Sequence, residues 1–351
     1  MHIPDGYLSP STCAAMYVAS APWWWSALRR TRRKLLGRGL PQLALFAAFS
    51  FVTMMFNLPL PGGTTGHAVG MGIAAIVLGP WASLLAISFA LTIQALFFGD
   101  GGITTLGANC FNMAIAGSFA AWGIYSLLSH GAAPDSRRRV VAAALAGYGA
   151  INLSALLAAI EFGIQPMLFH DASGAPLYAP YPLRIAIPAM MIGHLTIAGI
   201  AEAVMCAGLF TYLRRNEPAL LHLPSLSEVN APRPVSGLWA TLAVVLLLTP
   251  LGILAGGAAW GEWAAKDFST AAARAQIAAV SHAAPPASAP TGLARLATLW
   301  TAPIPDYAPH LAIKSAAFGY LLSALFGVGL ILSAAWIAQR LGLLASQRRV
   351  Q

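Results

Sequence analysis

RVVAAALAGYGAINLSALLAAIEFG, residues 139–163, is an apolar run with one basic residue at its start and one acidic residue near its end. A helix needs about 20 apolar residues to cross a bilayer core about 30 Å thick. This stretch is long enough to do so. It therefore predicts a membrane-spanning helix, and its neighbours along the chain repeat the pattern.

Comparable apolar runs occur along the rest of the chain, at 8–28, 41–59, 67–79, 81–98, 103–129, 183–213, 236–256 and 313–338. The chain is 58% hydrophobic and only 9% charged, whereas soluble domains are about 25% charged. No run alternates in the manner of an outer-membrane barrel strand. We predict an all-α fold, a polytopic transmembrane helical bundle.

The basic residues predict its orientation. If the N-terminus is outside, 15 of the 20 Lys and Arg residues lie on the cytoplasmic side, in 29–38, 137–139, 214–235 and the C-terminal tail. Cytoplasmic loops of membrane proteins are enriched in Lys and Arg. We therefore expect an extracytoplasmic N-terminus and a cytoplasmic C-terminus, and we interpret the formal charge of +9 as a topology signal rather than a sign of nucleic-acid binding.

A polar, proline-containing stretch at 214–235 interrupts the apolar pattern. We interpret it as a cytoplasmic linker between two parts. The first, 1–213, would be a bundle of about seven helices. The second, 236–351, would be a two-helix transmembrane module with an extracytoplasmic loop at about 257–312.

Several catalytic signatures are missing from the sequence. It has no GxxxxGK[ST] phosphate loop, no HExxH and no GxSxG, and its three cysteines have no CxxC spacing. We therefore expect no enzyme activity, packed thiols, and ATP hydrolysis, if transport needs it, on another subunit. A membrane metalloenzyme ranks low because no carboxylate stands at metalloprotease spacing.

The chain opens MHIPDGYLSP, which offers a set of metal ligands. The Met1 amine, the His2 backbone nitrogen and the His2 Nδ1 atom can bind one ion through a five-membered and a six-membered ring. Three nitrogens nearly in one plane suit divalent nickel or copper, provided that the backbone nitrogen loses its proton. Taken alone, a histidine at position 2 is an ordinary side chain.

A fourth ligand is available in PLPGGTTGHAVGMG, where His67 follows a run of glycines and threonines. This loop is also outside in the predicted topology. Thr64 and Thr65 could hydrogen-bond the imidazole or the loop carbonyls that orient it. The two histidines together on one face favour a metal site.

Two ionisable residues, His194 and Glu202, lie within the apolar run 183–213. Such residues mark transport pathways by default, so they could form the relay of a permease that works alone. The alternative is that each is a hydrogen-bonded interior residue or a contact with a partner subunit. We favour the alternative.

Four motifs resemble one family in their order along the chain: MHIPDGYL, PGGTTGHAVG, VLGPWA and IQALFFGDGGITTLGANCFNMAIAG. They are similar to those of the CbiM/NikM family, the substrate-binding components of energy-coupling factor importers for cobalt and nickel, over roughly 1–213. Two later stretches, PLGILAGGAAWGEW and PIPDYAP, resemble the small NikN-type subunit, here joined to the larger component.

The resemblance implies a metal site formed by Met1, His2 and His67. It further implies covering and orienting roles for the matched residues Thr64, Thr65, Gln94, Asp100 and Asn109. The ALFAA stretch resembles an AxxxA docking pattern for a transmembrane coupling subunit, with Ala44 and Ala48 four residues apart. Two cytoplasmic ATPase subunits would complete an importer in the cytoplasmic membrane.

The choice of metal depends on loop type and ligand geometry. The GGTTGHAVG loop resembles the nickel form, and a square of nitrogen donors suits low-spin nickel. We predict Ni²⁺ as the bound substrate and no organic cofactor. Co²⁺ in the same role, in cobalt uptake for cobalamin biosynthesis, is the alternative, and a stand-alone metal permease is a second.

Overall fold

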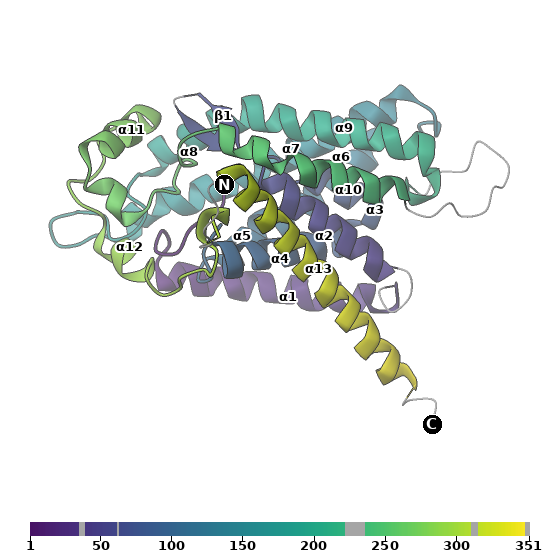
Figure 1. The fold of residues 1–351 in the computed structure, drawn as a ribbon. Coiled ribbons are helices and arrows are strands. Elements are labelled where there is room, and N and C mark those ends of the chain that lie inside the picture. Colours follow the sequence, from purple (N-terminus) through teal and green to yellow (C-terminus); the bar gives the residue numbers. More distant parts are fainter. Residues whose placement is uncertain (35–38, 62, 222–235, 310–314, 348–351) are drawn as a thin grey trace.

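The computed structural model describes residues 1–34, 39–61, 63–221, 236–309 and 315–347, and it shows a bundle in which most of the long helices run side by side (Figure 1). The C-terminal helix crosses the others obliquely and projects beyond them. The helices up to residue 216 are α1 (Pro10–Lys34), α2 (Leu40–Met54), α3 (Met71–Leu78), α4 (Pro80–Ile93), α5 (Leu106–Asn109), α6 (Ser118–Ser129), α7 (Arg137–Leu168), α8 (Leu183–Gly193) and α9 (Gly199–Asn216). The later helices are α10 (Ser236–Leu248), α11 (Ala271–Ser281), α12 (Thr291–Leu296) and α13 (Ala316–Gln347).

Three π-helical segments lengthen the helices, and two of them join one helix to the next. They are Gln94–Phe98 after α4, Cys110–Gly117 between α5 and α6, and His194–Ala198 between α8 and α9. A short antiparallel hairpin of β1 (Leu58–Leu60) and β2 (Thr64–Gly66) precedes α3. The helical prediction is confirmed, because each apolar run expected from the sequence contains a helix.

Six helical stretches of the described residues are long and apolar enough to cross a membrane. They are Pro80–Phe98, Leu106–Ser129, Arg137–Leu168, Leu183–Asn216, Gly237–Leu254 and Ala316–Leu341. Three predicted spans fall outside this set. The α2 helix has only 15 residues and α3 only 8. The apolar part of α1 is diluted by Ser and Thr residues and ends in a basic run.

The α7 helix, which contains the stretch 139–163, lies at the centre of the bundle and packs against α3, α6, α8 and α9. Its buried face is made mainly of small residues, namely Ala142, Ala143, Ala146, Gly147, Ala150, Ser154, Ala155, Ala158 and Ala159. Small side chains let helices approach closely where lipid supplies no hydrophobic driving force. The residue choice of α7 therefore permits a tight core.

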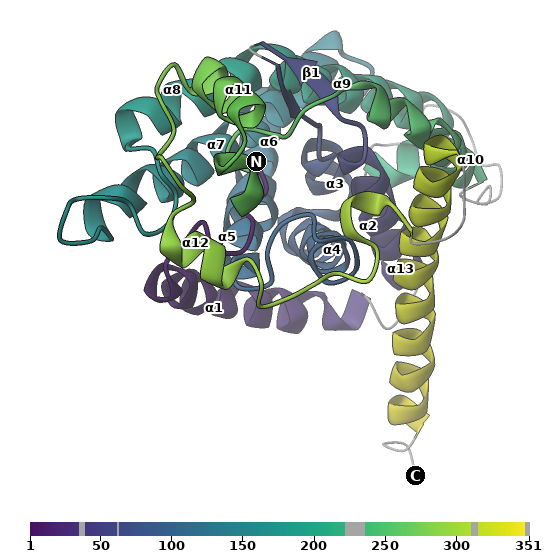
Figure 2. The same cartoon turned by 60° about the vertical axis from the view of Figure 1, so that its left-hand side comes forward.

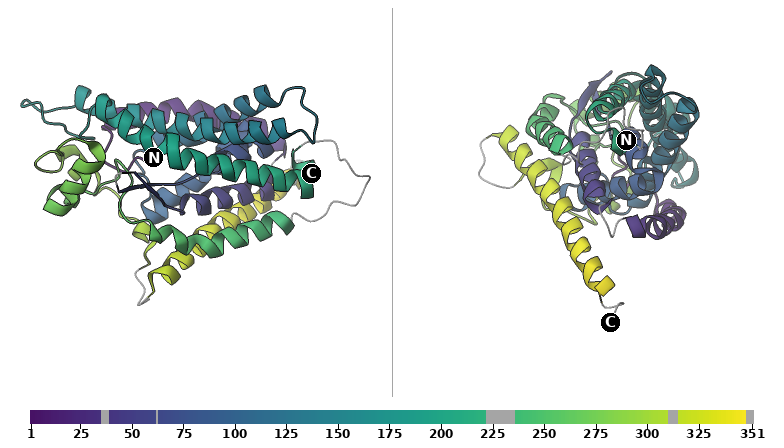
Figure 3. Two further views of the ribbon diagram at one scale, coloured as in Figure 1. Left: turned by 90° about the horizontal axis from the view of Figure 1, so that it is seen from above. Right: turned by 90° about the vertical axis from the view of Figure 1, so that its right-hand side faces the viewer.

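The segment after α10 folds over one end of the bundle. Figure 2 looks along the helices from the end that holds the N-terminus, and α11 and α12 lie across that end. Seen from above, the two ends of the bundle differ, because this segment occupies one end and the C-terminal part of α9 reaches the other (Figure 3). The predicted linker 214–235 is described only up to residue 221, and its remainder lies outside the described residues.

Buried side chains on α2 correct one prediction. Ala44 and Ala48 are only 1% and 0% exposed, because α2 packs against α4, α10 and α13 of the same chain. The predicted AxxxA face is therefore covered by other helices of the same chain and is not free to dock on a partner in this structure.

All three cysteines, Cys13, Cys110 and Cys206, are free and buried, as expected for packed thiols.

Candidate metal-binding site

The N-terminal segment enters the bundle and is fixed there through the backbone of Ile3. Asn109 holds this residue on both sides, since its Oδ1 atom accepts the Ile3 N–H at 2.8 Å and its Nδ2 atom donates to the Ile3 carbonyl at 3.1 Å. The same carbonyl accepts the Gly102 N–H at 2.9 Å and the Thr105 hydroxyl. His2 is therefore placed by bonds to its neighbour, and its own backbone nitrogen stays available.

Gly102 is required for this close approach of two chain segments. A Cβ atom at position 102 would lie 2.4 Å from both the backbone nitrogen and the Oδ1 atom of Asp5. The Asp5 carboxylate in turn accepts the N–H groups of Ile103 and Thr104 at 3.1 and 2.8 Å. The loop that contains Asp100 is thereby attached to the first residues of the chain.

His2 is 1% exposed and faces Asp100. Its Nδ1 atom is hydrogen-bonded to Asp100 Oδ1. The other oxygen, Oδ2, accepts from Gln94 Nε2 at 3.0 Å and from the Tyr307 hydroxyl at 2.5 Å. Burial alone would raise the pKa of Asp100, but the charge and hydrogen bond of the His2 imidazole lower it below its ordinary value.

The Met1 amine is paired with the carboxylate of Glu262, which lies 261 residues later in the chain. Its nitrogen lies 3.2 Å from Glu262 Oε1, in the segment between α10 and α11. Met1 itself is buried, and Glu262 is 22% exposed. A protonated amine in this position gains a direct ion pair.

His67 follows the hairpin and is 5% exposed. Its Nδ1 atom lies 3.0 Å from the Ala68 carbonyl, which makes Nδ1 the donor and leaves the lone pair on Nε2. The Nε2 atoms of His2 and His67 are both buried without a hydrogen-bond partner. The two rings lie 4.9 Å apart between centroids, tilted by 38°. Two nitrogens without partners thus belong to adjacent imidazoles.

Protonation of His67 is disfavoured. Burial, together with the positive charges of His2 and of the Met1 amine, lowers the pKa of His67 well below its ordinary value of about 6.5. The imidazole is therefore neutral at neutral pH. A neutral imidazole nitrogen is a good ligand for nickel, copper, cobalt or zinc.

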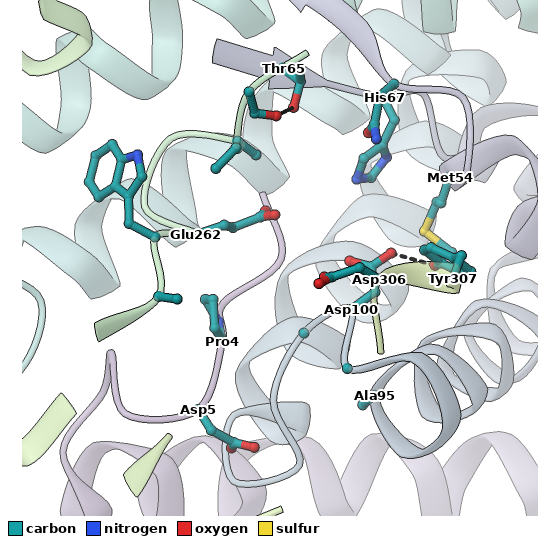
Figure 4. Close-up of a pocket in the computed structure, with 18 of the residues that line it drawn as sticks. Pro4, Asp5, Met54, Thr65, His67, Ala95, Asp100, Glu262, Asp306 and Tyr307 are labelled. Atoms are coloured by element: carbon teal, nitrogen blue, oxygen red, sulfur yellow. Dashed lines mark hydrogen bonds between the residues drawn. The ribbon is translucent and has the colours of Figure 1, made fainter. Parts of the chain in front are cut away.

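A cavity of about 540 Å³ lies in front of these groups. Figure 4 shows His67, Asp100 and Glu262 around it, with Asp306 and Tyr307 from the segment before α13. Four carboxylates line it, those of Asp5, Asp100, Glu262 and Asp306, and no Lys or Arg side chain does so among the described residues. The cavity therefore has the charge that attracts cations.

The structure places some of the expected site residues as predicted and others differently. The structure brings together the proposed ligands Met1, His2 and His67. Asp100 contacts His2 directly, Gln94 contacts Asp100, and Asn109 holds the backbone of Ile3. Nδ1 of His2, however, is held by Asp100, so the atom of His2 left without a partner is Nε2.

The two threonines are placed differently from the prediction. Thr64 donates to the Ala258 carbonyl at 3.0 Å and Thr65 to the Gly257 carbonyl at 3.4 Å. Neither orients the imidazole of His67. Their hydroxyls instead attach the hairpin to the segment that follows α10, because β2 and this segment lie side by side.

Sequence reasoning missed Glu262 and Tyr307 as site residues. Both are more than 190 positions away in sequence from the groups they contact, so no local spacing connects them to the site. A signal was present, because Glu262 lies in PLGILAGGAAWGEW and Tyr307 in PIPDYAP. Those two motifs carried the NikN-type resemblance.

Side chains alone do not make a metal site here. Among the described residues, no group of three or more His, Cys, Asp and Glu side chains is arranged to hold a metal ion. Any site at this position must use main-chain donors as well. The terminal amine and the backbone nitrogen of His2 are the donors available.

His194 and Glu202 do not form a relay. Glu202 accepts hydrogen bonds from backbone N–H groups, and His194 Nδ1 donates to the Met190 carbonyl at 2.8 Å. No hydrogen bond joins the two in the part of the chain that the structure describes. The interpretation of both as hydrogen-bonded interior residues agrees with this arrangement.

Comparison with known proteins gives consistent matches. The profile of the CbiM family, described as the cobalt uptake substrate-specific transmembrane region, matches residues 2–220. The chain is 57% identical over 350 residues to the fused nickel transport protein NikMN of Rhodobacter capsulatus, covering 99% of each chain. It is 40% identical over 331 residues to the probable fused nickel transport protein LarMN of Lactiplantibacillus plantarum, covering 93% of this chain and 94% of that one.

A solved structure is also similar. The crystal structure of a transition metal transporter matches with a TM-score of 0.58 at 50% sequence identity, and the match covers 61% of this chain and 93% of that one.

Proposed function

The chain belongs to the CbiM/NikMN family of nickel and cobalt transport proteins, and from this membership we propose that it is the metal-binding component of an ATP-dependent importer of the energy-coupling factor type. In this proposal it captures Ni²⁺ on the outer side of the cytoplasmic membrane. The ligands are the Met1 amine, the backbone nitrogen and imidazole of His2, and the imidazole of His67.

One observation carries the proposal: two buried imidazole nitrogens without partners lie on adjacent rings, beside the chain terminus. A buried polar atom without a partner is costly, and native structures rarely contain one without a reason. A metal ion is a natural partner for a neutral imidazole nitrogen. The substrate ion would bind Nε2 of His67 directly, and a turn of the His2 ring on binding would give its Nε2 atom a partner in Asp100.

Binding would exchange two existing contacts. The Met1 amine would leave Glu262 and lose its proton, and the His2 ring would turn so that Nδ1 leaves Asp100 for the ion. Asp100 could then accept a hydrogen bond from the Nε2–H group of the same ring, as carboxylates do for metal-bound histidines. Because metal binding releases protons, the affinity should rise with pH.

Nickel is the favoured ion for two reasons. Four nitrogen donors in one plane suit low-spin Ni²⁺, and the two compared fused relatives carry nickel in their names. Cobalt in the same role is the alternative, since the matching family profile is described by cobalt uptake.

The remaining parts of the importer are inferred from what this chain lacks. The sequence has no phosphate-binding loop, so we assign ATP hydrolysis to two cytoplasmic subunits and force transmission to a transmembrane coupling subunit. We assign 1–213 to the metal-binding bundle, 214–235 to a linker, and 236–351 to a NikN-like module whose outer segment covers the site.

The decisive experiment blocks the terminal amine without changing a side chain. The full chain is purified in detergent with its native N-terminus, checked by intact mass, and compared with a form that carries four extra glycines before Met1. We expect the extension to weaken Ni²⁺ binding by about 100-fold or more, because it takes the terminal amine away from His2 and breaks the chelate ring. Bound nickel in the native chain should be diamagnetic.

A form with four glycines added after the C-terminal residue is the matched control and should leave the Kd unchanged. Equal affinity in the N-terminally extended form would refute the chelate. Uptake into vesicles that contain this chain and no ATPase would instead support a stand-alone permease.

A further inference from the structure

Glu202 is a buried carboxylate that the proposed chelate does not use. It lies on α9, within the membrane-crossing stretch Leu183–Asn216, and is 0% exposed. A buried carboxylate is tolerated only when hydrogen bonds or opposite charges compensate for the lost water. The groups that bond to Glu202 therefore indicate which part of the protein this side chain holds in place.

Glu202 accepts hydrogen bonds from three backbone N–H groups of one short segment. Glu202 Oε2 accepts from Val69 at 2.7 Å and from Gly70 at 3.0 Å, and Oε1 accepts from Gly72 at 3.3 Å. This segment begins two residues after His67 and forms the start of α3. Gly70 has a φ of 80°, a left-handed conformation that glycine adopts without strain.

The start of α3 needs an acceptor of this kind. The first N–H groups of a helix have no partner within the helix and carry partial positive charge. At α3 no side chain of the segment itself caps them. The carboxylate of α9 satisfies them instead, so the exit of the His67 loop is attached to a membrane-crossing helix.

The neighbouring helices leave Glu202 little freedom to turn away. At Gly147 of α7, an added Cβ atom would lie 3.1 Å from the Glu202 carbonyl oxygen and 3.3 Å from its Cγ atom. At Gly72, an added Cβ atom would lie 2.7 Å from the Cα atom of Gly147. Three helices thus meet closely around this side chain.

The imidazole of His67 depends on this attachment for its direction. Among the described residues, its hydrogen bond is to the carbonyl of Ala68, its own neighbour. The ring therefore takes its orientation from the backbone of residues 67–69, and that backbone is held by Glu202 at Val69. Groups that orient a metal ligand in this way commonly affect metal affinity about 10- to 100-fold.

We propose that Glu202 is the positioning residue of the metal site, which holds the His67 loop so that Nε2 of His67 faces His2. The proposal rests on the proposed function for its metal readout. It assigns Glu202 a role through the loop backbone, without contact to the ion.

The test compares Glu202→Gln and Glu202→Asp in the full chain, with Glu161→Gln as the matched control. Glutamine keeps the size but turns an N–H₂ group toward backbone N–H groups, whereas aspartate keeps the carboxylate and shortens the reach. Glu161 is also a buried carboxylate on a membrane-crossing helix, and it accepts a hydrogen bond from Asn112 Nδ2 at 2.9 Å. Neither residue belongs to the His67 loop.

Two readouts are measured, and only one needs metal. In the metal-free protein, Glu202→Gln should speed hydrogen exchange of a peptide covering residues 67–72 by about tenfold, and Glu161→Gln should not. With nickel, Glu202→Gln should raise the Kd about 10- to 100-fold and shift the absorption bands of bound nickel. Glu202→Asp should recover part of both effects.

The outcomes separate the two proposals. If Glu202→Gln only lowers the unfolding temperature, and its folded fraction keeps the native exchange rate, Kd and nickel spectrum, the positioning role is wrong. If the unaltered chain does not bind nickel through its terminus but Glu202→Gln still frees the 67–72 peptide, the chelate fails and the attachment by Glu202 stands.

Discussion

The protonation of His67 illustrates how single residues prepare the site. Its ring is buried, so protonation would place a charge where there is little water, and the nearby His2 imidazole and Met1 amine oppose that charge further. The same burial leaves the lone pair of Nε2 free of a proton. His67 is therefore able to act as a ligand at neutral pH.

This environment predicts a pH dependence of stability. Because the folded pKa of His67 is lowered, the unfolded chain takes up a proton near pH 6.5 that the folded chain refuses. The free energy of unfolding of the metal-free protein should therefore fall as the pH drops below about 6.5. The contribution is at most about 1.4 kcal/mol per pH unit, and it ends at the folded pKa.

His67→Gln should remove this contribution, because glutamine does not titrate. Urea unfolding of the metal-free full chain, measured from about pH 7.5 to about pH 5, gives the slope for each protein. The other titrating groups are common to both, so the difference between slopes isolates His67. Identical slopes would show that His67 is protonated equally in both states.

At the scale of elements, the contact between α2 and α13 connects helix packing to the site. Phe51 of α2 lies beside Phe98 and Tyr307, with ring centroids 5.5 and 6.3 Å away. Tyr307 in turn donates to Asp100. On the other side of Phe51 lies Gly327 of α13, where an added Cβ atom would approach the Phe51 ring to 2.1 Å.

Gly327→Ala should therefore destabilise the protein. The added methyl has no room and must displace Phe51 or separate the helices, a kind of overpacking that costs about 1–3 kcal/mol. The measurement is the midpoint of thermal unfolding of the full chain in detergent. Gly329→Ala is the matched control, because nothing lies within 4 Å of its added Cβ atom. Equal midpoints for the two variants would mean that α13 does not pack on Phe51 in solution.

The local features of this molecule were predictable from the sequence, and the long-range ones were not. Helices in the apolar runs follow from composition, and the pairing of His2 with His67 followed from motif and topology. The contacts of Glu262 with Met1 and of Tyr307 with Asp100 join segments that no periodicity relates. Thr64 and Thr65 were expected to bond the His67 imidazole or the loop carbonyls that orient it, but their acceptors are the carbonyls of Ala258 and Gly257, which are 194 and 192 residues later.

At the scale of the whole molecule, the two ends of the bundle have opposite chemistry. One end holds the N-terminus, the acidic cavity and the covering segment with α11 and α12 (Figure 2). At the other end, the arginines that follow the α6–α7 turn and those at the end of α9 come together, since Arg214 donates to the Asp135 carbonyl at 2.9 Å. Cations would be attracted to the first end, and the positive-inside rule assigns the second to the cytoplasm.

This polarity predicts the orientation of the chain in the membrane, which single cysteines can test. The three natural cysteines are buried, so they should contribute little labelling. Ser288→Cys places an exposed thiol on the covering segment, and Asp135→Cys places one on the α6–α7 turn. In intact cells or spheroplasts, a membrane-impermeant maleimide should label position 288 at once. Position 135 should react only after permeabilisation. The arginines beside this position are expected to keep the α6–α7 turn on the cytoplasmic side. The reverse pattern would put the cavity in the cytoplasm and rule out capture of metal from outside.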